Sequence, residues 1–310
     1  MLFISWPVWA EPPVEVFRPI EAKWLVQAVA EAPFYSFYLG APNIRGVAYL
    51  PNFAPRLGPR VVYRQVGVTL TFSLPIPKIE VDRRGDSEAN SFILNSYWRQ
   101  FAYDLYYQHY QGFYSASPFT ELSFRKPSRY PQMPDARVVN YGINAYWVLR
   151  PEKYSLKAAF DQNEFQMESG GSWILNPYYG HLRMFLGGRF VPGSDSSALP
   201  DLPNLSTANF DTTGLAVGYG YTYIKNHLFF SGQAAYGPGL QYQAIDQKDG
   251  GDRHVLSLAA KLNVNAAAGW NYPDHVTGAK LLVDSTWAKV LDTQVSSTMV
   301  SLQAFWGKRF

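Results

Sequence analysis

The sequence contains no cysteine, and this absence excludes several kinds of site at once. A chain without thiols forms no disulfides, has no thiol nucleophile and cannot hold a metal through cysteine, although this does not fix its compartment. The sequence also lacks any continuous apolar run of about 18 residues, the length that a membrane-spanning helix needs. Disulfide scaffolds and helical membrane proteins are therefore excluded as classes.

Charge is scarce as well. Charged residues make up 16% of the 310 residues, whereas roughly a quarter is usual in soluble domains. The net charge is +3 and no cluster of lysine and arginine stands out, so no nucleic-acid partner is predicted. What the chain has instead is aromatic residues, with 22 Tyr, 20 Phe and 9 Trp. Many rings without an apolar block predict apolar residues at every second position.

The alternation is visible along the chain. In 138–149 one face carries Val139, Tyr141, Ile143, Ala145 and Trp147, and the other carries Asn140, Gly142 and Asn144. The same period of two recurs in 214–224 and 255–265. The runs are near ten residues long, which matches a strand that crosses a bilayer at a tilt. Their polar faces are small and neutral, as expected inside a barrel that has lipid outside.

These patterns predict an all-β fold, an antiparallel closed transmembrane β-barrel of about 12 strands. The candidate strands are 62–74, 91–98, 101–113, 137–149, 153–164, 171–179, 182–190, 212–224, 227–238, 254–266, 276–288 and 297–310. A hairpin from 34–40 and 45–50 would raise the number to 14. Short connections at 97–100, 150–153 and 224–227 alternate with long polar ones, as between the periplasmic and exterior sides of outer-membrane barrels. Aromatic residues beside the short turns, among them Tyr97, Trp98, Trp147 and Tyr154, predict a bilayer boundary there.

Both ends of the chain suggest where in the cell the protein is located. Residues 1–10 are similar to the apolar core and cleavage site of a secretory signal without its basic start, the alternative being a buried N-terminal segment. Residues 11–33 would then be a periplasmic segment and 34–310 the barrel. The ending "MVSLQAFWGKRF" alternates up to Phe310 and resembles the C-terminal signal that barrel-assembly machinery recognises. The predicted location is the outer membrane of a Gram-negative bacterium.

Three central blocks carry a narrower resemblance: "FAYDLYYQHYQGFY" (101–114), "MPDARVVNYGINAYWVL" (133–149) and "YSLKAAFDQNEFQMESGGS" (154–172). They resemble the signature blocks of an uncharacterised bacterial outer-membrane barrel family, of the domain-of-unknown-function type and best represented among Bacteroidetes-like bacteria. The resemblance extends from about residue 30 to the end. It implies a barrel in the outer membrane and no known reaction.

Candidate binding residues follow from the polar face of two strands. If Ala102 points inward, so do Asp104, Tyr106, Gln108 and Tyr110. In 153–164 the faces are mixed, and a bulge near Phe160 would bring further polar groups inward. These further lumen candidates are Lys157, Asp161, Gln162 and Glu164. A ligand-binding set and a structural hydrogen-bonded network are both compatible with the pattern.

For function we expect a narrow channel or a barrel that binds a small solute. The alternatives are a barrel that displays its long exterior loops and a lipid-modifying enzyme embedded in the membrane. No nucleophile motif accompanies the five histidines, and the loop 246–252 lacks a full calcium-ligand spacing. No catalytic residue, metal or cofactor is therefore predicted; outer-membrane lipid and the assembly machinery are the predicted partners. A secreted aromatic-rich β-sandwich that binds carbohydrate is the rival fold.

Overall fold

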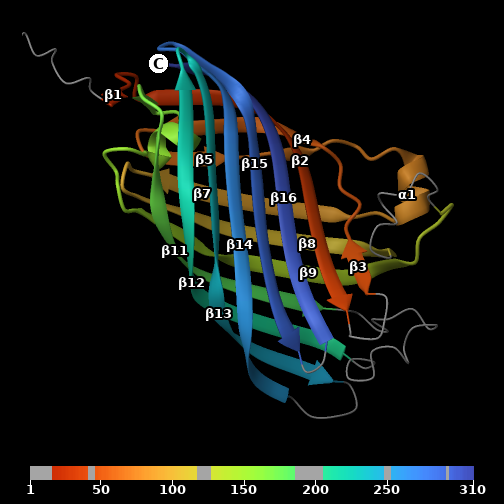
Figure 1. Cartoon of the computed structure of the whole chain (residues 1–310). Helices are drawn as coiled ribbons and strands as arrows, with labels where there is room; N and C mark the ends of the chain where they lie inside the picture. The colour runs from red at the N-terminus through yellow and green to blue at the C-terminus, as the bar shows by residue number, and fades with distance from the viewer. Residues whose placement is uncertain (1–15, 41–45, 117–126, 186–204, 248–252, 291–292) are drawn as a thin grey trace, which may run out of the picture.

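The computed structural model describes residues 16–40, 46–116, 127–185, 205–247, 253–290 and 293–310, so the signal-like segment 1–10 lies outside the described residues. Most of the described chain forms long antiparallel strands (Figure 1). The elements are β1 (Phe17–Pro19), β2 (Trp24–Gly40), β3 (Val47–Leu50), β4 (Arg56–Tyr63), β5 (Val66–Thr69), β6 (Phe72–Ser73), α1 (Lys78–Arg84), β7 (Glu88–Tyr97), β8 (Phe101–Ala116), β9 (Gln132–Val148), a π-helical turn (Lys157–Asp161), β10 (Glu164–Gln166), β11 (Gly170–Phe185), β12 (Leu205–Lys225), β13 (Leu228–Gln247), β14 (Arg253–Asn271), β15 (His275–Val290) and β16 (Thr293–Arg309).

The sheet closes on itself. Hydrogen-bonded neighbours follow the order β2, β16, β15, β14, β13, β12, β11, β9, β8, β7, β5 and β4, and β4 pairs again with β2. This ring of twelve strands confirms the predicted closed antiparallel barrel. The last strand pairs with β2 from Gln294↔Gly40 to Arg309↔Leu25. The amide of Phe310 then donates to the carbonyl of Trp24 at 3.0 Å, so the chain ends at the seam.

The strands that make up the ring differ from several of those predicted. A tight turn at Arg64, which has a φ of 54°, divides 62–74 into β4 and β5. The predicted strands 171–179 and 182–190 join as β11 up to Phe185, because Gly180 lies inside a strand and does not mark a turn, and residues 186–190 lie outside the described residues. Strand β2 begins at Trp24, so the barrel includes residues 24–33, which the sequence placed ahead of it. There the inward face mixes Leu25 and Val29 with Gln27 and Glu31, so polar and apolar residues do not alternate regularly.

The barrel narrows toward one end. Strand β3 pairs with β2 through Phe37↔Tyr49 and with β8 through Tyr49↔Ser115. At this end β3 therefore takes the place that β4, β5 and β7 fill elsewhere, and fewer strands give a smaller diameter. We call this the loop-side end; β3 and α1 lie toward it, and β1 and the C terminus lie at the opposite, turn-side end (Figure 1).

Apolar side chains cover the outside of the barrel. Leu256, Leu258 and Leu302 are more than half exposed, and they alternate with inward side chains. Exposed rings gather near the short turns: Trp24, Trp98, Trp147, Trp173, Tyr221, Tyr223, Trp270 and Trp306. Tyr97 and Tyr154 were expected in this group, but both are buried inside the barrel.

Residues 153–164 do not form a wall strand, and this prediction is wrong. The chain leaves β9 through a turn at 149–153 and enters the turn-side end of the barrel as the π-helical turn and β10. Leu156 is helical and Gln162 adopts a left-handed conformation with a φ of 53°, so a period of two cannot continue. We call Tyr154–Gln166 the plug. No helix within the described ranges is long and apolar enough to cross a membrane.

Candidate functional site

The loop-side end of the lumen is filled by aromatic side chains. Tyr35 and Tyr110 lie with their ring centroids 4.6 Å apart, and Phe53 lies 5.3 Å from Tyr110 on its other side. Phe37 and Phe113 join the same buried cluster. Tyr110 was predicted as a lumen residue, and the structure places it in this packed layer. The narrow end of the barrel is therefore closed by an apolar core.

The turn-side end is closed by the plug, which four cationic side chains contact from the wall and the turns. Arg60 of β4 pairs with Asp161, and Lys280 of β15 donates to the carbonyl of Phe160. Arg309 of β16 donates to the carbonyl of Gln162 at 2.6 Å, and Arg99 pairs with Glu164 at 2.5 Å. Each contact joins the plug to a different part of the barrel, so they hold it across the opening.

Further interactions fix the plug from outside. Strand β1 pairs with β10 through Phe17↔Gln166 and Pro19↔Glu164, so the N-terminal segment crosses this end of the barrel. Ser155 Oγ donates to Glu164 at 2.9 Å. The hydrogen bond from Arg99 to Glu164 raises the pKa of Arg99, and burial raises the pKa of the Tyr154 phenol. The raised pKa keeps Arg99 positively charged at neutral pH beside Glu164.

The predicted set Lys157, Asp161, Gln162 and Glu164 therefore belongs to the plug. Asp161, Gln162 and Glu164 are buried, and their partners are wall cations or, for the Gln162 side chain, the carbonyl of Ala159 at 2.9 Å. None of the four lines the cavity described next. The structure thus separates them from the set on β8.

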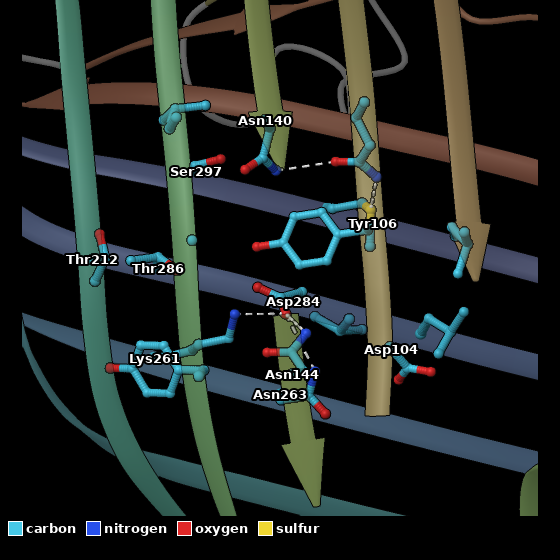
Figure 2. A pocket seen from close by; sticks show the side chains of 18 of the residues that line it. Asp104, Tyr106, Asn140, Asn144, Thr212, Lys261, Asn263, Asp284, Thr286 and Ser297 are labelled. Carbon is cyan, nitrogen blue, oxygen red and sulfur yellow. Dashed lines mark hydrogen bonds and ion pairs between the residues drawn. The ribbon is translucent and has the colours of Figure 1, made fainter. Parts of the chain in front are cut away.

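Between the two closures lies a cavity of about 120 Å³, which we call the lumen cavity. Asp104, Tyr106 and Gln108 of β8 line it, as their shared face predicted. The side chain of Tyr106 extends along the wall, so that its hydroxyl lies beside Gly142 of β9 and Gly180 of β11 (Figure 2). Its ring has room because β9 and β11 carry Gly142 and Gly180 opposite each other, and a Cβ at Gly142 would lie only 2.6 Å from the Tyr106 hydroxyl.

Polar side chains span the cavity from β9 to β14 and β15, which lie across the ring from each other, and we call them the polar cluster. Asp284 of β15 accepts from Lys261 Nζ at 2.9 Å, from Asn144 Nδ2 at 3.1 Å and from Asn263 Nδ2 at 3.3 Å, and Figure 2 shows the Lys261 amine directed at this carboxylate. The Lys261 ammonium also lies 5.0 Å from the ring of Tyr178. Lys261 is 2% exposed, and a buried charged group needs partners of this kind.

The rest of the lining mixes polar and apolar side chains. Phe210 of β12, Leu182 of β11, and Leu282 and Met299 of β15 and β16 are among the apolar ones that face the same space. The polar cluster and these apolar side chains therefore line one cavity together. Such a lining suits a molecule that has both an apolar part and a polar group.

Two acceptors beside the Lys261–Asp284 pair have no hydrogen-bond partner within the described chain. They are Asn144 Oδ1 and Tyr178 Oη, whose residues are 5% and 4% exposed. A buried polar atom without a partner costs roughly 1–3 kcal/mol. A ligand that donates a hydrogen bond to either atom would recover that free energy.

Sequence reasoning missed Lys261, Asn263 and Asp284, which form the centre of the polar cluster. The signal was present, because Lys261 and Asn263 belong to the polar, inward face of 255–265. Their meeting with Asp284 depends on the register Asn263↔Asp284 between β14 and β15, which alternation alone does not give. No group of three or more metal-ligating side chains occurs among the described residues.

Fold and site together define a closed antiparallel barrel with a plugged end and an internal cavity. The chain belongs to the family described as "Domain of unknown function (DUF4421)", which matches residues 23–310. No curated protein matches the chain. The resemblance seen in the central blocks is thus confirmed as membership of a family of unknown function that spans nearly the whole chain.

The solved structures that are similar to this chain include three proteins of low sequence identity. The outer-membrane protease OmpT of Escherichia coli shares 6% identity at a TM-score of 0.42, over 94% of this chain and 97% of that one. The toluene transporter TodX of P. putida shares 10% identity at a TM-score of 0.25, over 94% and 90%. The attachment invasion locus protein Ail of Yersinia pestis shares 8% identity at a TM-score of 0.25, over 90% and 97%. At these values no site or activity carries over.

Proposed function

We propose that this chain is an outer-membrane β-barrel that binds a small amphipathic solute in its lumen cavity, and that it is not an open diffusion channel. The observation that carries the proposal is the polar cluster. It places a buried ion pair beside two unpartnered acceptors in a cavity that apolar side chains also line, between two closed ends.

Residence in the outer membrane is supported by the outer surface. A band of exposed leucines, valines and alanines with rings near the short turns suits lipid contact, because rings with a polar edge prefer the bilayer boundary. The turn-side end would face the periplasm and the loop-side end the exterior. Phe310 is 65% exposed at the seam, which suits recognition by barrel-assembly machinery as a partner.

The size of the cavity limits the solute. A cavity of about 120 Å³ is close to the engineered apolar cavity of about 150 Å³ that takes up benzene. The solute would be about as large as one six-membered ring. Its apolar part would contact Phe210, Leu182 and Leu282, and a hydroxyl or amine would donate to Asn144 Oδ1 or Tyr178 Oη.

Benzyl alcohol is a suitable probe, because it has one ring and one donor. We expect it to raise the thermal midpoint of the barrel refolded in detergent, with a stabilisation of about 2.7 kcal/mol at a hundred times its Kd. Unheated and heated gel migration would follow the folded fraction. Toluene, which has the same ring and no donor, should stabilise the protein less.

A matched pair of variants separates cavity binding from adsorption to the surface. Ala288→Leu adds volume to the cavity lining, whereas Ala279→Leu adds the same volume to the exposed outer face of the same strand. The stabilisation by benzyl alcohol should disappear in Ala288→Leu and persist in Ala279→Leu. Equal stabilisation of both variants would show that the alcohol binds elsewhere and would contradict the proposal.

A further inference from the structure

On the outer face, three neighbouring strands carry a polar patch near the loop-side end. The pairing places Tyr107 of β8, Tyr141 of β9 and His181 of β11 in one row across the strands. The next row toward the turns contains Leu105, Ile143 and Tyr179, and beyond it the face is largely apolar. The row therefore marks the place where the apolar band ends.

The polar row is held together by its own contacts. The ring of His181 stacks on Tyr141 with centroids 4.7 Å apart, and its Nδ1 lies 2.8 Å from Asp211 Oδ1. Tyr179 Oη donates to the same oxygen at 2.7 Å. The Asp211 carboxylate is thus already engaged by two neighbours, which limits its repulsion of a second anion.

Two arginines lie one and two rows farther toward the loop side. Arg183 of β11 pairs with Val139, and Arg137 of β9 pairs with Phe185, so the arginines are diagonal neighbours on the outer face. Such positions lie roughly 7–8 Å apart. The guanidinium of Arg183 lies 4.4 Å from the centre of the ring of Phe185, the residue that pairs with Arg137. Both arginines are exposed, and neither forms an ion pair with any described acidic residue.

Arginine presents several N–H donors in a planar fork that matches the oxygens of a phosphate. Here the guanidinium groups of Arg137 and Arg183 project from the sheet just beyond the apolar band. In a membrane-embedded barrel this is the depth of the headgroups, and His109 lies in the same row as Arg183 across β9. The lipid chains would then lie over Tyr141 and the apolar rows below it.

We propose that Arg137 and Arg183, with His181 and Tyr141 beneath them, form a binding site for the phosphate of a membrane lipid in the exterior leaflet. The inference rests on the membrane residence in the proposed function and is independent of the lumen cavity. Each arginine near a charged headgroup contributes about 1 kcal/mol, and every 1.4 kcal/mol is a factor of ten. Losing both should weaken retention of the lipid roughly 30-fold.

The test uses the full chain refolded into phosphatidylcholine vesicles that contain a small share of spin-labelled phosphatidic acid, a lipid with an exposed phosphate monoester. Immobilised label measures the lipid held by the barrel. We expect Arg137→Ala/Arg183→Ala to lose the immobilised fraction that the wild type shows above labelled phosphatidylcholine. Lys289→Ala, which removes an exposed cation from β15, should keep it.

Three results would overturn the proposal. The first is equal retention of the two labelled lipids by the wild type, and the second is equal loss in the Lys289 and double-arginine variants. The third is full competition by free inorganic phosphate at equal concentration, which would assign the site to a soluble anion. Failure of the barrel to insert into plain phosphatidylcholine vesicles would instead contradict the proposed membrane residence, so the two failures are distinguishable.

Discussion

A variant that lacks both lumen closures is expected to conduct ions in planar bilayers, whereas the wild type is expected to pass no current. The plug and the aromatic cluster lie in series along the lumen, so either one alone blocks the path. The plug excludes ions by filling the wider end through contacts such as Arg60 to Asp161. The cluster around Tyr35 and Tyr110 excludes them because a dry apolar constriction holds no water.

The experiment needs three variants. One replaces residues 156–163 of the plug with a short Gly-Ser linker, the second is Tyr35→Ala/Tyr110→Ala, and the third combines them. Discrete current steps should appear only in the third. Tyr107→Ala is the matched control for the ring change, because this exposed tyrosine belongs to the same strand and faces outward. Heat-modifiable gel migration identifies the variants that still fold. Steady conduction by the wild type would contradict the closed-lumen proposal.

The features of the fold that depend on alternation could be predicted from the sequence. On β9 and β12, small polar residues face inward and aliphatic or aromatic residues face outward, so the period of two gave the correct faces. It also placed Asp104, Tyr106 and Gln108 together in the lumen, since one strand fixes their common direction. These predictions needed only local geometry.

Features that depend on the third dimension could not be predicted. The plug contacts join residues far apart in sequence, such as Arg309 and Gln162. No pattern within 153–164 indicates which distant residues these partners are. The mixed faces of that segment were the available signal, and they indicate a chain that is surrounded on all sides. Likewise, β2 was missed in part because Gln27 and Glu31 point inward to Arg60 and Ser301, partners from other strands.

The strongest dependence of stability on single residues is expected at the Lys261–Asp284 pair. Asp284→Leu leaves the ammonium of Lys261 buried without its carboxylate, and Lys261→Met leaves Asp284 with only the two amide donors. Removing one partner of a buried ion pair typically costs about 3–5 kcal/mol. Asp284→Leu should cost more than Lys261→Met, because the side chain of Lys261 is 2% exposed and that of Asp284 is 18% exposed on the cavity side.

The double variant Lys261→Met/Asp284→Leu should recover much of this loss, since replacing both charges with apolar groups of similar size is often close to neutral. Urea unfolding of the barrel refolded in phospholipid vesicles measures each free energy of unfolding, and the cycle gives the coupling between the two residues. Lys289→Met provides the baseline for removing an exposed lysine and should stay within about 0.5 kcal/mol of the wild type. If the two single losses simply add in the double variant, the pair is not a coupled unit. The residues of the polar cluster would then contribute to stability independently. A solute could not be bound there by Lys261 and Asp284 acting together.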